Sequence, residues 1–284
     1  MKNIIRIIAL ALCLVILVSC NDGGEPMNPN NNQTDPTPKK PDPVLTEVAN
    51  PLNVYSAFDA YESDNGMPYR IYYPANYSEE YAYPVILFLH GAGERGTDNE
   101  APLVHVLQGL FDDTRSPVYQ SIVIVPQCPE GEQWVNTPWE NGSYDSDAVG
   151  ESDALKEALA ILEMVCTQDS VNRDRIYAMG LSMGGYGTWN LLMNHSDIFA
   201  AGVPICGAAD PSKADVLKDM PIFAFHGDAD GVVPVSGTDD MYNAIIAAGG
   251  ENITYKRVAG RGHNVWTDAA SCSEMHYWLF DQSK

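Results

Sequence analysis

The chain has 284 residues, 45% of them hydrophobic, and its 38 acidic residues against 16 basic ones give a formal net charge of −22 at pH 7. This apolar content is enough for one large globular domain with a sizeable core. The strong negative charge argues against binding to nucleic acid or to anionic lipid, because both are themselves negatively charged. It also disfavours polyanionic substrates.

The amino terminus has the pattern of an export signal. Two basic residues precede an unbroken apolar run at Ile7–Val18, which is short for a membrane span and has the length of a signal-peptide core. The run ends in Leu17-Val18-Ser19-Cys20, which resembles the bacterial lipobox. The resemblance implies a lipoprotein signal peptide at residues 1–20 and a lipid anchor on Cys20. We therefore expect a protein of the bacterial cell envelope, in the outer membrane and facing either the periplasm or the cell surface. A secreted protein with an incidental cysteine, or an uncleaved anchor, is the alternative.

The composition changes twice after the signal sequence. Residues 21–43 are rich in Asn, Pro, Asp, Thr and Gly, and such a segment buries too little apolar surface to fold, so it is predicted to be a disordered tether. From residue 44 to residue 284 short apolar runs alternate with amphipathic stretches. This part is predicted to form one folded domain.

The apolar runs predict strands and the amphipathic stretches predict helices. Runs without polar alternation, such as Val85–Leu89, indicate strands buried on both faces and therefore a central, mostly parallel sheet. The alternation of strands and helices predicts an α/β architecture, after a short antiparallel start at about 56–73. Strands are predicted at 69–73, 85–90, 122–126, 175–180, 200–205, 222–226 and 253–258, and helices at 152–166, 183–194, 237–248 and 268–280.

Gly180-Leu181-Ser182-Met183-Gly184 matches the G-x-S-x-G pattern of a serine nucleophile. The motif follows a predicted strand and precedes a predicted helix, so the serine would sit on a sharp turn between them. The glycines leave room for that turn because they have no Cβ. We therefore predict that Ser182 is the nucleophile; a glycine-rich structural turn is the alternative.

A nucleophilic serine on this kind of turn takes its acid and its base from later in the chain, in that order. His263 lies in a glycine-rich loop after a predicted strand and is the predicted base, whereas His276 lies inside a predicted helix and is expected to be a packing residue. Asp228 and Asp230 both follow the strand at 222–226. One should orient the imidazole and the other cap the turn, and the residues alone leave that choice open.

The run Gly91–Gly96 matches the G-x-G-x-x-G dinucleotide fingerprint, but no apolar helix opens after it, as that fingerprint requires. We interpret the run as an oxyanion loop. The backbone N–H of Ala92 and that of Met183 are expected to face the developing oxyanion. His90 and His226, each followed by glycine, are expected to be structural.

Taken together, these motifs resemble those of bacterial esterases related to phospholipase/carboxylesterases, dienelactone hydrolases and the feruloyl and acetylxylan esterases of carbohydrate esterase family 1. The resemblance implies the α/β-hydrolase fold, with a central, mostly parallel sheet flanked by helices. In the family pattern His-Gly-x-x-Asp-x-x-Val-Pro the second aspartate is catalytic, which implies Asp230. The resemblance also implies a serine carboxylic-ester hydrolase without a cofactor, acting on small-molecule or polysaccharide esters, with feruloyl or acetyl groups of plant cell walls as the expected class. The motifs are 90–96, 180–185, 226–234 and 262–266.

Some features stay open. Trp134 and Trp139 lie in a loop after the strand at 122–126; they could stack on a sugar or a cinnamoyl ring, or pack the loop onto the domain. No metal site is expected, because no histidines have i,i+4 spacing and no cysteines have C-x-x-C spacing. Disulfides and free thiols are equal alternatives for Cys128, Cys166, Cys206 and Cys272, and the oligomeric state is not readable. The rival functions are a serine peptidase similar to prolyl oligopeptidases and a non-catalytic glycan-binding lipoprotein.

Overall fold

The computed structural model describes residues 39–284. The predicted signal peptide, Cys20 and most of the predicted tether lie outside the described residues. No helix within 39–284 is long and apolar enough to cross a bilayer. The last residues of the predicted tether contact the domain, because Lys39 pairs with Asp174 at 2.5 Å and Asp42 pairs with Arg175 at 2.9 Å. Within the described residues, contacts with the domain thus include Lys39 and Asp42, which precede the boundary predicted at residue 44.

Eight strands form one sheet in the order β1-β2-β4-β3-β5-β6-β7-β8. β1 and β2 are antiparallel to their neighbours, and all the other neighbours are parallel. The sheet therefore has the predicted antiparallel start and the predicted parallel centre. The strands are β1 Phe58–Glu62, β2 Pro68–Tyr72, β3 Tyr83–Leu89, β4 Ile122–Pro126, β5 Val171–Leu181, β6 Ala201–Ile205, β7 Ile222–Gly227 and β8 Ile253–Val258.

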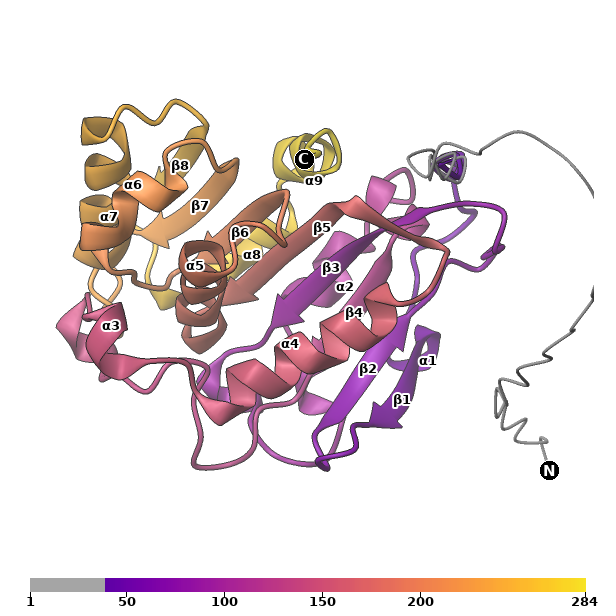
Figure 1. Cartoon of the computed structure of the whole chain (residues 1–284), viewed down its shortest axis with the longest axis horizontal. Helices are drawn as coiled ribbons and strands as arrows, with labels where there is room; N and C mark the ends of the chain where they lie inside the picture. Colours follow the sequence, from indigo (N-terminus) through magenta and orange to yellow (C-terminus); the bar gives the residue numbers. More distant parts are fainter. Residues whose placement is uncertain (1–38) are drawn as a thin grey trace, which may run out of the picture. The chain divides into compact units, whose positions relative to one another are not determined.

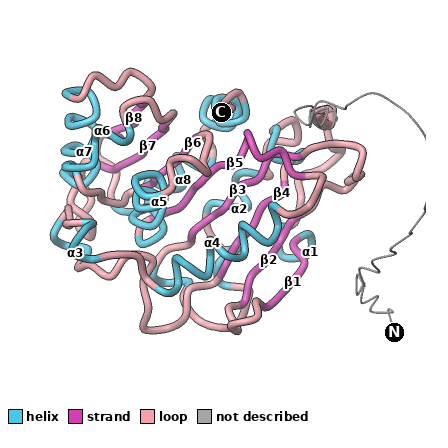
Figure 2. The backbone as a smooth tube through the Cα atoms, viewed as in Figure 1, coloured by secondary structure: helices cyan, strands magenta, loops and turns pink. Residues whose placement is uncertain are grey.

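Helices cover both faces of the sheet (Figures 1 and 2). Side chains of α4, α5 and α7 join the core on one face, and those of α2, α8 and α9 join the core on the other. The two cores explain why the sequence of β3 is apolar throughout. Leu87 packs into the first core, and its neighbours Ile86 and Phe88 pack into the second. The helices are α1 Val54–Ala57, α2 Val106–Leu110, α3 Ser146–Val149, α4 Asp153–Cys166, α5 Met183–Asn194, α6 Ala214–Leu217, α7 Ser236–Ala247, α8 Trp266–Ala270 and α9 Ser273–Phe280.

The seven predicted strands are all present, and the predictions for β4, β8 and α5 match their bounds. The prediction of one helix over 268–280 is wrong, because the chain breaks into α8 and α9. The Ser271 hydroxyl donates to the Thr267 carbonyl at 3.0 Å, and Cys272 has ψ 87°, outside the helical region. A serine side chain that bonds a carbonyl of the preceding turn competes with continuation of the helix.

The sheet brings four loops to one edge. The carboxyl ends of parallel strands meet there, and this is where open α/β sheets gather their functional groups. The loop after β3 carries the 3₁₀ turn Ala92–Glu94, β5 ends directly before Ser182, β7 leads into the aspartate loop, and the loop after β8 carries the 3₁₀ turn His263–Val265.

Candidate active site

Ser182 occupies a strained turn between β5 and α5, with φ 54° and ψ −118°. Its N–H donates to the Ile205 carbonyl at 2.8 Å, which fixes the turn against β6. The turn also packs closely on β3: a Cβ on Gly184 would lie 1.9 Å from the Leu89 carbonyl oxygen. Only glycine fits at position 184, and this close packing keeps the turn tight. The tight turn holds Ser182 in a left-handed conformation that projects its side chain from the sheet edge.

The three predicted triad residues form one hydrogen-bonded chain. His263 Nε2 lies 2.8 Å from Ser182 Oγ, and His263 Nδ1 lies 2.7 Å from Asp230 Oδ2. The loops that carry the histidine and the aspartate lie against each other, because a Cβ on Gly227 would come within 2.5 Å of the Arg261 and Gly262 carbonyl oxygens. A proton can therefore pass from the serine to an imidazole whose other nitrogen faces a carboxylate.

The Asp230 carboxylate is fully buried. Burial alone would raise its pKa, but hydrogen bonds from His226, His263 and the Val232 N–H outweigh that effect and hold the pKa well below its usual range. Oδ1 accepts the N–H groups of Val232 and Val233 at 2.8 and 3.0 Å. The group is therefore a carboxylate anion that stabilises positive charge on His263.

His226 supports Asp230, a role that the motif alone did not reveal. Its Nε2 lies 3.3 Å from Asp230 Oδ2 and 3.1 Å from the Val233 carbonyl. Because both neighbours are acceptors, Nε2 carries a proton and donates to them. Nδ1 lies 2.8 Å from the hydroxyl of Thr238. The four-residue spacing between His226 and Asp230 around a tight turn is the sequence signal that could have indicated this contact.

Asp228, the other candidate acid, faces away from the histidine. Its carboxylate pairs with Arg257 Nη1 at 3.1 Å and accepts the Gly260 N–H at 2.7 Å. It thus closes the turn after β8. The turn after β7 is capped by Asp230 itself, through the N–H groups of Val232 and Val233, so the expected division of the two roles between the two aspartates is wrong. The geometry therefore places Asp230, and not Asp228, beside His263.

His90 orients the loop after β3. Its Nε2 accepts the Cys128 N–H at 2.9 Å, so the proton is on Nδ1, which donates to the Gly91 carbonyl at 2.6 Å. Because the peptide is trans, the Ala92 N–H points away from His90. A Cβ on Gly91 would lie 3.6 Å from Ser182 Cβ, so this peptide is next to the nucleophile.

The predicted oxyanion donors begin two helical turns at this edge. Ala92 opens the 3₁₀ turn after β3, and Met183 opens α5 directly after Ser182. The first N–H of a helical turn has no acceptor within that turn, so both groups are free to bind an anion. The positive end of the α5 dipole adds to this preference.

Buried neutral histidines should make the protein sensitive to acid. Burial lowers the pKa of His90, and likewise that of His276, to about 4. The unfolded chain therefore takes up protons first, and stability falls as the pH drops from about 6.5 to about 4. We expect urea unfolding to show a loss of about 2 kcal/mol per histidine between about pH 7 and about pH 4.5. His90→Gln should lose part of this dependence; an identical pH dependence in the variant would contradict this explanation.

Of the two alternatives for Trp134, the structure excludes stacking on substrate. Its side chain is fully buried, and its indole N–H donates to the His90 carbonyl at 3.0 Å. It therefore packs the loop onto the domain. Trp139 is only partly buried, the Arg95 guanidinium lies 5.8 Å from its ring, and its carbonyl accepts the Tyr186 hydroxyl at 2.9 Å. These contacts keep Trp139 near the oxyanion loop and the first turn of α5.

The four cysteines within residues 39–284 are free thiols. One of them, Cys206, lies behind the triad, and its sulfur, an Asp230 oxygen and a His263 nitrogen all lie within 4.8 Å of one another. This grouping is poorly suited to a metal ion. Burial raises the pKa of the Cys206 thiol well above its usual range, and a protonated thiol is a weak ligand. The His263 nitrogen and the Asp230 oxygen already share a hydrogen bond.

Solved structures with the same fold include two esterases. A thermostable esterase superposes with a TM-score of 0.68 at 30% identity, over 81% of this chain and 64% of that chain. The present chain thus spans less than two thirds of that esterase's length. A feruloyl esterase module from Clostridium thermocellum, complexed with sinapinate, superposes with a TM-score of 0.56 at 17% identity, over 78% of this chain and 85% of that module.

Sequence comparisons identify the family as well as the fold. The chain is 25% identical over 248 residues to a protein named "Putative esterase NocK" from Nocardia uniformis subsp. tsuyamanensis, covering 84% of this chain and 67% of that protein. The family model Esterase, described as "Putative esterase", matches residues 62–276, which include all four loops of the site. The chain therefore belongs to the Esterase family, carboxylic-ester hydrolases with the α/β-hydrolase fold.

Proposed function

We propose that this site hydrolyses carboxylic esters through an acyl-enzyme on Ser182. Its Oγ attacks the ester carbonyl while His263 Nε2 takes the hydroxyl proton, and Asp230 stabilises the resulting imidazolium. The N–H groups of Ala92 and Met183 stabilise the tetrahedral oxyanion. His263 returns the proton to the leaving alcohol, and water then releases the acid by the same route. The observation that carries the proposal is the hydrogen-bonded chain of 2.8 and 2.7 Å from serine to histidine to aspartate.

We also propose that the substrates are esters of plant cell-wall polysaccharides, with feruloyl or acetyl acyl groups. Two observations support this class. The sinapinate in the feruloyl esterase module is a planar aromatic acid bound by a protein of the same fold. In this chain, partly exposed Trp139 with Arg95 over its ring lies next to the oxyanion loop, where an aromatic acyl group could stack.

A small substrate panel tests the function. We expect the chain from Asn21 onward to hydrolyse methyl ferulate or acetylated xylan with a higher kcat/KM than p-nitrophenyl acetate, because binding energy from the natural acyl or sugar group is used in the transition state. An aminoacyl anilide serves as the peptidase substrate. Turnover of the anilide alone would identify a peptidase, and no turnover of any substrate would favour a non-catalytic binding protein.

We further propose that Cys20 carries a lipid anchor that holds the protein in the bacterial cell envelope, with no other membrane contact. The export signal and the lipobox support this location. In bacteria grown with labelled palmitate, the protein should incorporate label and partition into detergent, since two acyl chains anchor a protein stably. Cys20→Ser should abolish both properties. Unlabelled wild-type protein released to the medium would point to simple secretion.

A further inference from the structure

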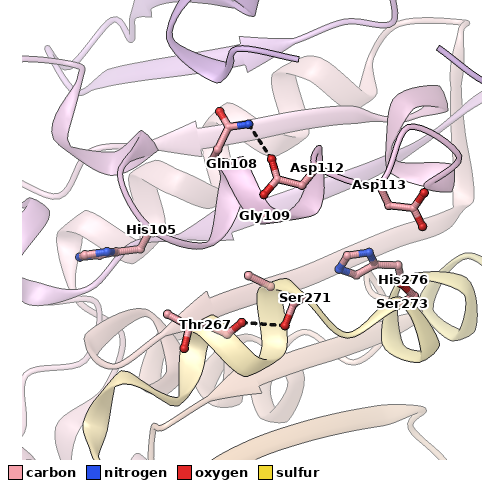
Figure 3. A pocket seen from close by; sticks show the side chains of 10 residues that line it. His105, Gln108, Gly109, Asp112, Asp113, Thr267, Ser271, Ser273 and His276 are labelled. Atoms are coloured by element: carbon pink, nitrogen blue, oxygen red, sulfur yellow. Dashed lines mark hydrogen bonds between the residues drawn. The ribbon is translucent and has the colours of Figure 1, made fainter. Parts of the chain in front are cut away.

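A groove runs between α2 and α8 and reaches the start of α9 (Figure 3). Its volume is about 630 Å³. His105, at the start of α2, lines one end of the groove, and His276 of α9 lies at the other end, with its ring directed into the gap. None of the mechanistic steps proposed for the triad uses this groove.

His276 is the most unusual group of the groove. The residue is 2% exposed, and neither ring nitrogen makes a hydrogen bond of normal geometry, although the Ala270 backbone lies close enough to favour the protonated ring. Burial lowers its pKa to about 4, although the Ala270 backbone and the Asp113 carboxylate oppose the shift. The ring is therefore neutral near pH 7, with one N–H donor and one bare nitrogen acceptor. Unpaired buried polar groups are destabilising, so the position favours a ligand that both donates and accepts.

The rest of the lining narrows the chemistry of that ligand. Hydroxyl and carboxylate groups line the groove, and no lysine or arginine does. An anionic ligand would be repelled by Asp112 and Asp113, whereas hydroxyl groups can donate to both carboxylates and pair with either nitrogen of His276. A metal ion is disfavoured, because among residues 39–284 the only set of three metal-type ligand atoms close enough together is the Cys206 set at the triad. The groove therefore suits a neutral polyhydroxylated molecule.

The groove leads to the catalytic edge of the sheet. The ring of His105 lies 5.2 Å from that of Trp266, which in turn lies 5.4 Å from the ring of His263. His105 Nε2 also lies 3.3 Å from Glu94 Oε1, in the oxyanion loop. A long molecule in the groove would therefore approach the site from the side of the histidine loop.

We propose that the groove between α2, α8 and α9 binds a neutral glycan chain, the alcohol part of a polysaccharide ester whose acyl group enters at Ser182. The proposal rests on the proposed esterase function for the identity of that chain. Sugar hydroxyls pair with His276 and with the carboxylates at the far end, and the chain extends past His105 towards the triad.

Binding of unesterified glycans tests the groove without any turnover. We expect xylohexaose or cellohexaose, titrated into the wild-type chain by calorimetry, to bind, and polygalacturonate not to bind. His276→Leu should weaken binding about 5- to 10-fold, the effect of about one lost hydrogen bond. Its Tm should be equal to or above that of the wild type, because two unpaired buried polar atoms are removed. Absence of binding by both neutral hexaoses, or equal binding by His276→Leu, would overturn the proposal.

A steric variant tests the link to catalysis. Ser271→Trp should obstruct the groove and lower kcat/KM on acetylated xylohexaose about 10-fold more than on methyl ferulate, whereas Met164→Trp, on α4 at the other face of the sheet, should change neither. Equal effects of Ser271→Trp on both esters would overturn the proposal while leaving the esterase function intact. If no ester is hydrolysed, the esterase function fails, and the calorimetric result still decides whether the groove binds glycan.

Discussion

Replacing Ser182 by alanine is expected to lower kcat for ester hydrolysis about 10⁵- to 10⁶-fold, the effect seen when a serine hydrolase loses its nucleophile. Without Oγ the acyl-enzyme cannot form, and the only remaining catalysis comes from the oxyanion donors acting on water. Alanine keeps the same left-handed backbone demand as serine, so the fold should be retained. Initial rates on methyl ferulate and p-nitrophenyl acetate, measured with a Tm for each protein, test this.

Ser212→Ala is the matched control, because Ser212 is an exposed serine outside the site. It should leave both rates unchanged. If Ser182→Ala does not fold, the same rates are measured on Ser182→Cys, which keeps a nucleophile of similar size. A folded Ser182→Ala protein with rates within about 10-fold of wild type would contradict the acyl-enzyme mechanism.

Replacing Asp230 by asparagine should lower kcat about 10³- to 10⁴-fold with a smaller effect on KM. The amide no longer balances positive charge on His263, and its NH₂ group can hold the imidazole in the wrong tautomer. Asp228→Asn is the control, since that carboxylate bonds Arg257 and the Gly260 N–H rather than the histidine. A larger loss in Asp228→Asn than in Asp230→Asn would reverse the assignment.

The same variant has a consequence for stability. Because the pKa of Asp230 is held below its usual range, its ionised form contributes stability above the pKa of the unfolded chain, about 4, and this contribution is lost as the pH falls below that value. Asp230→Asn should therefore be less stable than the wild type near neutral pH, and the difference should shrink in acid. Chemical unfolding of both proteins, near neutral pH and below about pH 4, measures this difference.

Much of the architecture follows from local pattern. The apolar run of β3 indicates a strand buried on both faces, and Gly184 in its motif indicates the tight turn at Ser182, because both depend on neighbours along the chain. The break at Ser271 was missed because helical spacing of apolar residues continues across it, while a single hydroxyl-to-carbonyl bond ends α8. Such competition is too local to disturb the periodicity.

The pairing of groups in space was harder to predict. Asp228 and Asp230 lie on one loop, two residues apart, and only the direction of each side chain separates a partner of His263 from a partner of Arg257. The loop position of Trp134 leaves stacking and packing equally open, and only the structure shows that its indole N–H donates to the His90 carbonyl. Contacts between segments 40 or more residues apart leave no periodic signal in the sequence, so burial of a single side chain cannot be read from it.

The most direct test of the central claim is the position of covalent labelling by a fluorophosphonate, which reacts with an activated serine and mimics its tetrahedral intermediate. We would treat the chain from Asn21 onward with the probe and determine the intact mass and the labelled peptide by mass spectrometry. The proposed mechanism predicts one adduct per chain, on Ser182, with no adduct in Ser182→Ala. Ester hydrolysis by a chain that takes up no label, or that is labelled on another residue, would contradict it.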